Sequence, residues 1–275
     1  MQGSKAFPNI NTLSVIMATI TLAFSMTRIL PEKETVFNLN LGFAEFSLVF
    51  SSGTLVALFT AALAATGSQW IISEHPDPHV RSGKWYEFVS HWIIPVFTSF
   101  VVSITLNQMT KGNEWWILFG LGAFLLGMVF IAEYNVADVS DVNRPLASIG
   151  LIALSFSLFL ILAIAVRAAS LRLYLTLPIF AFAVLMMTLR TMYLRLRGGW
   201  KFELTSIIVL ISLLIVAGLH YIPISPIRYG LWVTAIFYAL ISFFCGLDEQ
   251  REAPSIYLEP LSMLILMGII GIFVA

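Results

Sequence analysis

Residues Trp115–Ala132 read WWILFGLGAFLLGMVFIA, a run without one charged side chain. A helix of about 20 such residues crosses a bilayer, because each residue rises about 1.5 Å and the hydrocarbon core is about 30 Å thick. Eight further apolar runs lie at Leu13–Leu30, Phe43–Thr66, Phe88–Met109, Leu146–Val166, Leu173–Leu194, Leu204–Ile222, Tyr229–Cys245 and Ile256–Ala275. The pattern predicts an all-α, polytopic transmembrane bundle of nine helices, or eight if the last run does not span.

The composition supports a chain whose surface faces lipid. Of its 275 residues, 59% are hydrophobic and 11% are charged, whereas a soluble domain carries about 25% charged residues. No stretch is polar enough to form a separate soluble domain, so we expect one integral membrane domain over residues 1–275. The net charge of zero gives no argument for a nucleic-acid partner. The single cysteine, Cys245, excludes a disulfide within the chain.

The basic residues predict the orientation. With nine spans, nine lysines and arginines fall on the side of the N-terminus and six on the other side. Because cytoplasmic loops carry the excess of basic residues, the N-terminus is predicted to be cytoplasmic. Most of the difference comes from one loop, Arg190 to Lys201. We expect an integral protein of a prokaryotic inner membrane.

Polar residues gather on that same predicted cytoplasmic side. They occupy four segments, Glu74–Lys84, Glu133–Pro145, Arg190–Lys201 and Asp248–Glu252, while the loops of the opposite side are short and ordinary. Taken alone, each segment is also explained by solvated ion pairs, which contribute little to stability. Taken together, the four segments predict a polar site over an apolar pocket.

Two acidic pairs give this predicted site its chemistry. Asp138 with Asp141, and Asp248 with Glu252, are spaced so that each pair shares a helical face. Their carboxylates could act as catalytic bases or hold Mg²⁺ beside a phosphorylated substrate, although no metal ligand is assigned. The predicted ligand-binding residues, basic or near the span ends of this face, are Arg144, Arg190, Arg251, His91 and Glu133.

The segment from Asp138 to Leu146, which ends in Asn-Arg-Pro-Leu, resembles the Asp-rich loop of the intramembrane prenyltransferases. That family is also built of nine helices. This chain departs from it in two ways: the longer Asn-Asp-x-x-Asp-x-x-x-Asp run is absent, and the segment follows the fourth helix instead of the second. The activity of the family is therefore not carried over.

The histidines narrow the choice of site. Pro76 and Pro78 lie between His75 and His79 and prevent a regular helix there. A helical His-Glu-x-x-His zinc site is therefore excluded, and a metal site in the loop remains possible. His91 and His220 fall on opposite sides of the predicted membrane, so we expect each to be hydrogen-bonded at an interface and not to share a ligand. Ionisable residues lie near span ends, and none stands at mid-span, where ion-coupled transporters need them.

Prolines and glycines inside the spans predict local geometry. Pro95 and Pro178 should kink their helices, which is tolerated because neighbouring groups satisfy the freed carbonyls. Gly120, Gly122 and Gly127 in the fourth span predict close helix packing.

Three classes of function remain. The first is a protein, whether or not it is an enzyme, that binds or processes a lipid-like ligand such as a phosphorylated isoprenoid, with membrane lipids as partners. The second is a transporter of a small, weakly polar solute that uses the two kinked helices. The third is a non-catalytic membrane subunit or scaffold. One-sided polar clustering favours the first.

Overall fold

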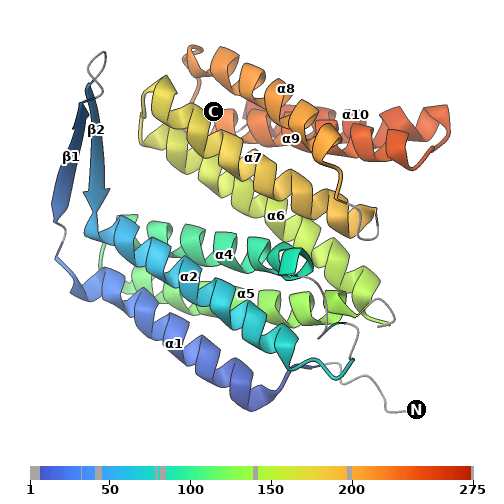
Figure 1. Cartoon of the computed structure of the whole chain (residues 1–275). Coiled ribbons are helices and arrows are strands. Elements are labelled where there is room, and N and C mark those ends of the chain that lie inside the picture. The colour runs from blue at the N-terminus through green and yellow to red at the C-terminus, as the bar shows by residue number, and fades with distance from the viewer. Residues whose placement is uncertain are drawn as a thin grey trace. The chain divides into compact units, whose positions relative to one another are not determined.

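The computed structural model describes residues 7–31, 33–40, 45–77, 80, 85–138, 142–196 and 200–273. The chain divides into two compact units, Met1–Ala147 and Ser148–Ala275. Unit 1 contains helices and one hairpin, and unit 2 contains helices (Figure 1). The prediction of a single domain stays a prediction.

The described residues of unit 1 form four helices, with a hairpin between the first two. Its elements are α1 (Ile10–Ile29), β1 (Glu34–Asn40), β2 (Glu45–Ser51), α2 (Ser52–Ser73), α4 (Trp85–Gln108) and α5 (Asn113–Ala137). Its apolar core takes residues from all four helices, among them Phe24, Ile71, Leu106 and Phe130. The most extensive helix pairing is that of α2 with α4, and α1 packs on α2.

Unit 2 is built of the last five helices. They are α6 (Arg144–Ala168), which begins just before the division, α7 (Leu173–Arg195), α8 (Phe202–His220), α9 (Pro226–Asp248) and α10 (Ala253–Phe273). Aromatic rings join three of them in the core: the ring of Phe159 lies 5.9 Å from that of Phe180 and 4.5 Å from that of Phe237. Ser225 caps α9, and Pro226 begins it, where a missing N–H costs nothing.

The predicted number of spans is confirmed, although the second begins later than predicted. In the part of the chain that the structure describes, nine helices of 19 to 25 residues are long and apolar enough to cross a membrane. The chain is therefore a multi-pass integral membrane protein with an all-α bundle fold. The last helix meets the same length and hydropathy criteria as the others.

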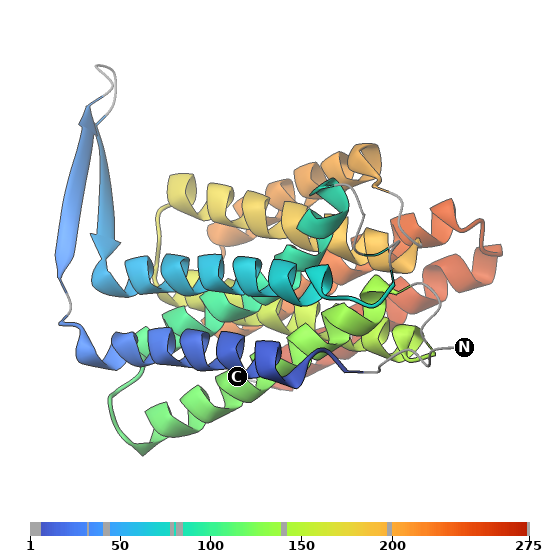
Figure 2. The ribbon, with the colours of Figure 1, turned by 60° about the horizontal axis from the view of Figure 1, so that its bottom comes forward.

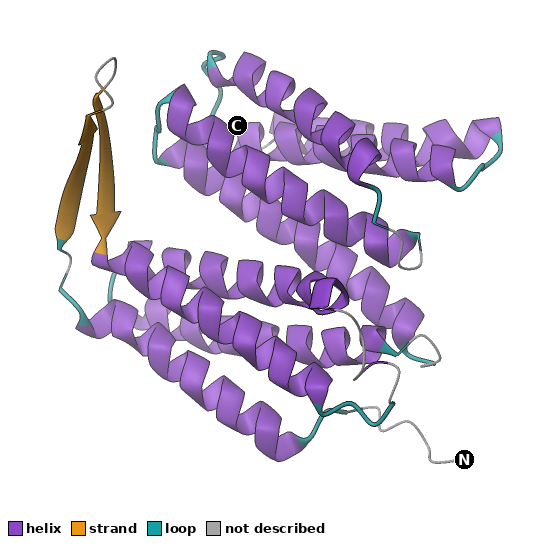
Figure 3. Cartoon of the chain, viewed as in Figure 1, coloured by secondary structure: helices purple, strands orange, loops and turns teal. Residues whose placement is uncertain are grey.

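The hairpin is the one element that the sequence prediction missed. The second span was predicted over Phe43–Thr66, but α2 begins at Ser52 because residues Glu45–Ser51 form a strand paired antiparallel with β1. Figures 2 and 3 show the hairpin extending past the ends of α1 and α2. A count of apolar residues cannot separate such a strand from the start of a helix. Glu45, predicted near a helix end, lies in β2.

Candidate functional site

One end of unit 1 carries buried polar side chains. Ser68 in α2, His91 in α4 and Glu133 in α5 are 1%, 7% and 1% exposed. His75, just after α2, and Asp138, the C-cap of α5, are also buried. We call these five residues the unit 1 polar cluster. His91 and Glu133 lie about one to two turns inside their helices, deeper in the protein than their positions near the predicted span ends imply.

The centre of the cluster is a buried acid–base pair. Nδ1 of His91 lies 2.8 Å from Oε2 of Glu133, although the two residues are 42 positions apart in the sequence. Both were predicted to bind ligand, and the structure brings them together. A carboxylate bonded to one ring nitrogen fixes the orientation of an imidazole, and imidazole exchanges protons near neutral pH. The pair is therefore suited to moving a proton.

Pro95 explains how α4 presents His91. In a regular helix the carbonyl of His91 would accept the N–H of the residue four positions later, but that residue is proline and has no N–H. Instead the hydroxyl of Ser68 donates to this carbonyl at 2.9 Å. The expectation that a neighbouring helix satisfies the freed carbonyl is confirmed, and the bond ties α2 to the turn that carries His91.

The rest of this end is also occupied by specific contacts. The ring of His75 lies 4.6 Å from that of Tyr134, and its Nδ1 accepts the backbone N–H of Asp77 at 3.1 Å. Glu74 accepts from the hydroxyl of Thr12 and the indole of Trp70, each at 2.7 Å. Glu74 therefore ties α1 to the end of α2.

One end of unit 2 is organised around Glu259 in the first turns of α10. Its Oε1 accepts from the guanidinium of Arg195 and from the hydroxyl of Tyr238, each at 2.8 Å. Its Oε2 accepts from Arg251 at 3.0 Å. A carboxylate near a helix N-terminus is favoured by the helix dipole. This network joins α7, α9 and α10 by charge as well as by packing.

The predicted unit 2 residues are partly engaged in this network. Arg251 also donates to Glu249 at 2.6 Å, while Lys201 donates to Asp248 at 3.0 Å. Burial lowers the pKa of Arg251, but hydrogen bonds with Glu249 and Glu259 outweigh it and raise the pKa above its usual range. Arg251 is therefore a charged, ion-paired group, and Glu252 is exposed to solvent.

The remaining predicted residues lie on α6 and α7 or outside the described residues. Arg190 is completely buried in α7, with its guanidinium carbon 5.6 Å from the ring centroid of Tyr193. Arg144 is half-buried at the first turn of α6. Asp141 and His79 lie outside the described residues.

The assembly of all four loops into one site stays a prediction. It needs Asp138 and Arg144 of unit 1 to meet Asp248, Glu252, Arg190 and Arg251 of unit 2, and each unit is described by itself. Within the described ranges, no group of three or more His, Cys, Asp and Glu side chains could hold a metal ion. The role of Mg²⁺ likewise stays a prediction.

Sequence reasoning missed the residues that position these groups. Ser68 could have been found by asking which polar side chain replaces the N–H that Pro95 lacks. Arg195, Tyr238 and Glu259 each look ordinary alone, because their contacts span 64 and 21 positions of sequence. A carboxylate in the first turns of a span was the available signal for Glu259.

The comparison with curated proteins and the comparison with solved structures each found no match. A family model matches residues 32–274, which covers the hairpin and every helix after α1. On that match, the chain belongs to the family described as "Protein of unknown function (DUF5656)".

Proposed function

We propose that this membrane protein binds a lipid-like ligand whose polar head reaches the predicted cytoplasmic face, and that His91 and Glu133 exchange a proton with that head. The observation that carries the proposal is the buried 2.8 Å pair between these two side chains. Ionisable residues inside membrane helices are costly and mark functional pathways more often than structural ones.

Stability alone does not account for the pair. A buried pair of ionisable side chains is often no more stabilising than apolar side chains of the same volume, because removing the two groups from water costs about as much as their attraction returns. The pair also has its own support, since Ser68 and Pro95 together hold the turn of α4 that carries His91. Such a positioned acid–base pair is expected where a proton is moved.

The one-sided gathering of polar residues favours a ligand with a polar head and an apolar tail. Asp138 and His75 lie buried at the same end of unit 1 as the pair. In the proposed reading, the lipid tail runs along the apolar helices of unit 1, and the polar head lies beside His91 and Glu133.

A second candidate is a transporter of a small, weakly polar solute. The buried His91–Glu133 pair favours it too, because proton relays in transporters use paired ionisable groups of this kind. Reconstituted vesicles separate the two. Transport predicts solute-dependent proton uptake that Glu133→Gln abolishes, whereas lipid binding predicts none.

The test of the main proposal is the lipid content of the purified protein by native mass spectrometry, with a panel of phosphorylated, zwitterionic and neutral lipids. The wild-type protein should prefer one phosphorylated class, and His91→Gln or Glu133→Gln should weaken that preference about tenfold, which is about 1.4 kcal/mol. The matched control is Glu114→Gln, at the opposite end of α5 from Glu133. A wild-type protein without any lipid preference contradicts the proposal and leaves the transporter and the non-catalytic scaffold.

A further inference from the structure

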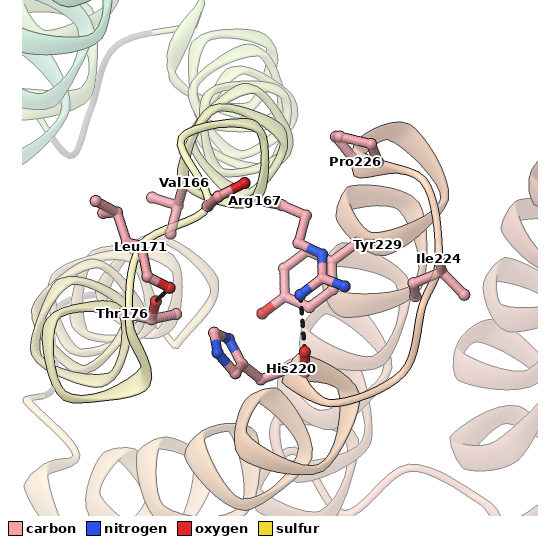
Figure 4. Close-up of a pocket in the computed structure, with 9 residues that line it drawn as sticks. Val166, Arg167, Leu171, Thr176, His220, Ile224, Pro226 and Tyr229 are labelled. Atoms are coloured by element: carbon pink, nitrogen blue, oxygen red, sulfur yellow. Dashed lines mark hydrogen bonds between the residues drawn. The ribbon is translucent and has the colours of Figure 1, made fainter.

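Unit 2 contains a cavity of about 370 Å³ at the end where α6 and α8 finish and α7 and α9 begin. Its lining includes Arg167, Ser170, Thr176, His220 and Tyr229 (Figure 4). Cavities of about 300–1,000 Å³ are the usual size for small-ligand sites. This end of unit 2 is away from the Arg195–Glu259 network, since α7 begins at the cavity and carries Arg195 at its last residue.

Tyr229 supplies an unusual donor to this cavity. The side chain is 1% exposed, yet its hydroxyl has no hydrogen-bond partner among the described residues. Figure 4 shows the hydroxyl pointing into the open space between His220 and Thr176. A buried hydroxyl without a partner costs free energy, and an acceptor on a bound ligand would recover it.

Arg167 places a fixed positive charge beside this hydroxyl. Its guanidinium donates to the carbonyls of His220 and Ile222, each at 2.8 Å, and its carbon lies 5.2 Å from the ring centroid of Tyr229. These bonds hold the group at the C-terminal end of α8. A guanidinium has five N–H donors, so two carbonyl contacts leave others for a ligand.

The local charge favours an anion. The sequence from Val166 to Thr176 and from Gly218 to Gly230 contains no aspartate or glutamate. The same two segments contain Arg167, Arg172, Arg228 and His220. A pocket lined by one arginine and a hydroxyl donor, with no carboxylate among its lining residues, suits the negative charge and the acceptor oxygens of a phosphate group.

We propose that this cavity binds a phosphate-bearing group, with the hydroxyl of Tyr229 and the guanidinium of Arg167 as its donors and His220 beside them. The group is either the head of a membrane phospholipid or a free phosphate compound. The site lies in unit 2 alone, at the end predicted to face away from the cytoplasm. It does not depend on the His91–Glu133 pair.

The test uses the full-length protein purified in detergent without phosphate, with two probes. Inorganic phosphate is compared with chloride at equal ionic strength by the midpoint of thermal unfolding, since a ligand that binds the folded state raises this midpoint. Phosphatidic acid is compared with diacylglycerol by native mass spectrometry. Stabilisation by phosphate identifies a free-phosphate site, and selective retention of phosphatidic acid identifies a lipid-head site.

The decisive variant is Tyr229→Phe, which removes only the hydroxyl. It should weaken binding of the active probe about tenfold while leaving the unfolding midpoint without ligand unlowered, because the hydroxyl has no partner to lose. Arg167→Lys, which keeps the positive charge but loses the planar guanidinium with its several N–H donors, should also weaken binding. The matched control is Tyr221→Phe at a side chain that is 75% exposed. The proposal is overturned if neither phosphate nor phosphatidic acid binds above its control. It is also overturned if Tyr229→Phe binds the active probe as well as the wild-type protein does.

Discussion

At the scale of single residues, the exchange between Pro95 and Ser68 explains how a polar side chain is placed inside an apolar bundle. The proline removes one N–H from α4, and the serine of α2 supplies a hydroxyl to the carbonyl that lost its partner. Membrane helices use such exchanges because lipid offers no hydrogen bonds. The consequence is that Ser68 acts on His91 by positioning its backbone.

This exchange predicts a coupled effect of two substitutions. Ser68→Ala should destabilise the protein by about 1–3 kcal/mol, because a buried carbonyl is left without a partner. In a Pro95→Ala background the new N–H can serve that carbonyl, so Ser68→Ala should cost less. A double-mutant cycle of unfolding free energies in detergent measures the coupling. Equal costs in both backgrounds would show that the hydroxyl does not replace the missing N–H.

The charged residues of unit 2 predict two very different costs. Glu259→Gln removes the charge that faces Arg195, whose side chain is 16% exposed, and should cost about 1–3 kcal/mol. Asp248→Asn breaks a pair whose lysine is 40% exposed and should cost at most about 1 kcal/mol. Thermal unfolding of the two variants in detergent gives the comparison. A larger loss for Asp248→Asn would reverse the assignment of the structural and the solvated pair.

At the scale of elements, the membrane-spanning helices could be predicted from the sequence, and the hairpin could not. Spans such as Leu173–Leu194 were predicted to within a residue of α7, because lipid demands a fixed length of apolar helix. The β1–β2 hairpin was missed because Phe46, Leu48 and Phe50 count as apolar in a strand and in a helix alike. The pairing of this segment with Glu34–Asn40 decides for a strand, and the apolar pattern alone does not reveal that pairing.

Glycines in α5 give a sharp test of helix packing. A Cβ on Gly122 would lie 2.5 Å from Cγ1 of Val102 in α4, whereas a Cβ on Gly120 would meet nothing within 4 Å. Gly122→Leu should therefore separate α4 from α5 and lower the unfolding midpoint strongly, since overpacking costs about 1–3 kcal/mol or more. Gly120→Leu, on the exposed side of the same helix, should be neutral. Equal effects would place the α4–α5 contact elsewhere.

At the scale of the whole molecule, the predicted orientation rests on the basic residues alone, and it predicts opposite labelling at the two ends of α8. In a Cys245→Ser background, Lys201→Cys should react with an impermeant thiol reagent only from the cytoplasmic side. Tyr221→Cys, at an exposed position at the other end, should react only from the outside. Labelling of Lys201→Cys from outside would invert the topology.

The candidate site was predictable in part at this scale. His91 and Glu133 were both predicted as ligand-binding residues of one face. Their direct pairing depends on how α4 packs on α5, which cannot be read from a single sequence. Asp248 and Arg251 were also singled out, and their pairing with Lys201 and Glu249 came only from the structure. The predicted meeting of Asp138 with Asp248 concerns both units and stays a prediction.

The proposed function requires that the His91–Glu133 pair serves a ligand and adds little to the stability of the fold. The most direct measurement is the double variant His91→Leu/Glu133→Leu, assayed for both its unfolding midpoint and its lipid content. We predict a midpoint close to that of the wild-type protein, because apolar side chains of similar volume often replace a buried pair of ionisable side chains without loss of stability. We also predict loss of the preferred phosphorylated lipid. A double variant that retains this lipid at the wild-type level would contradict the account.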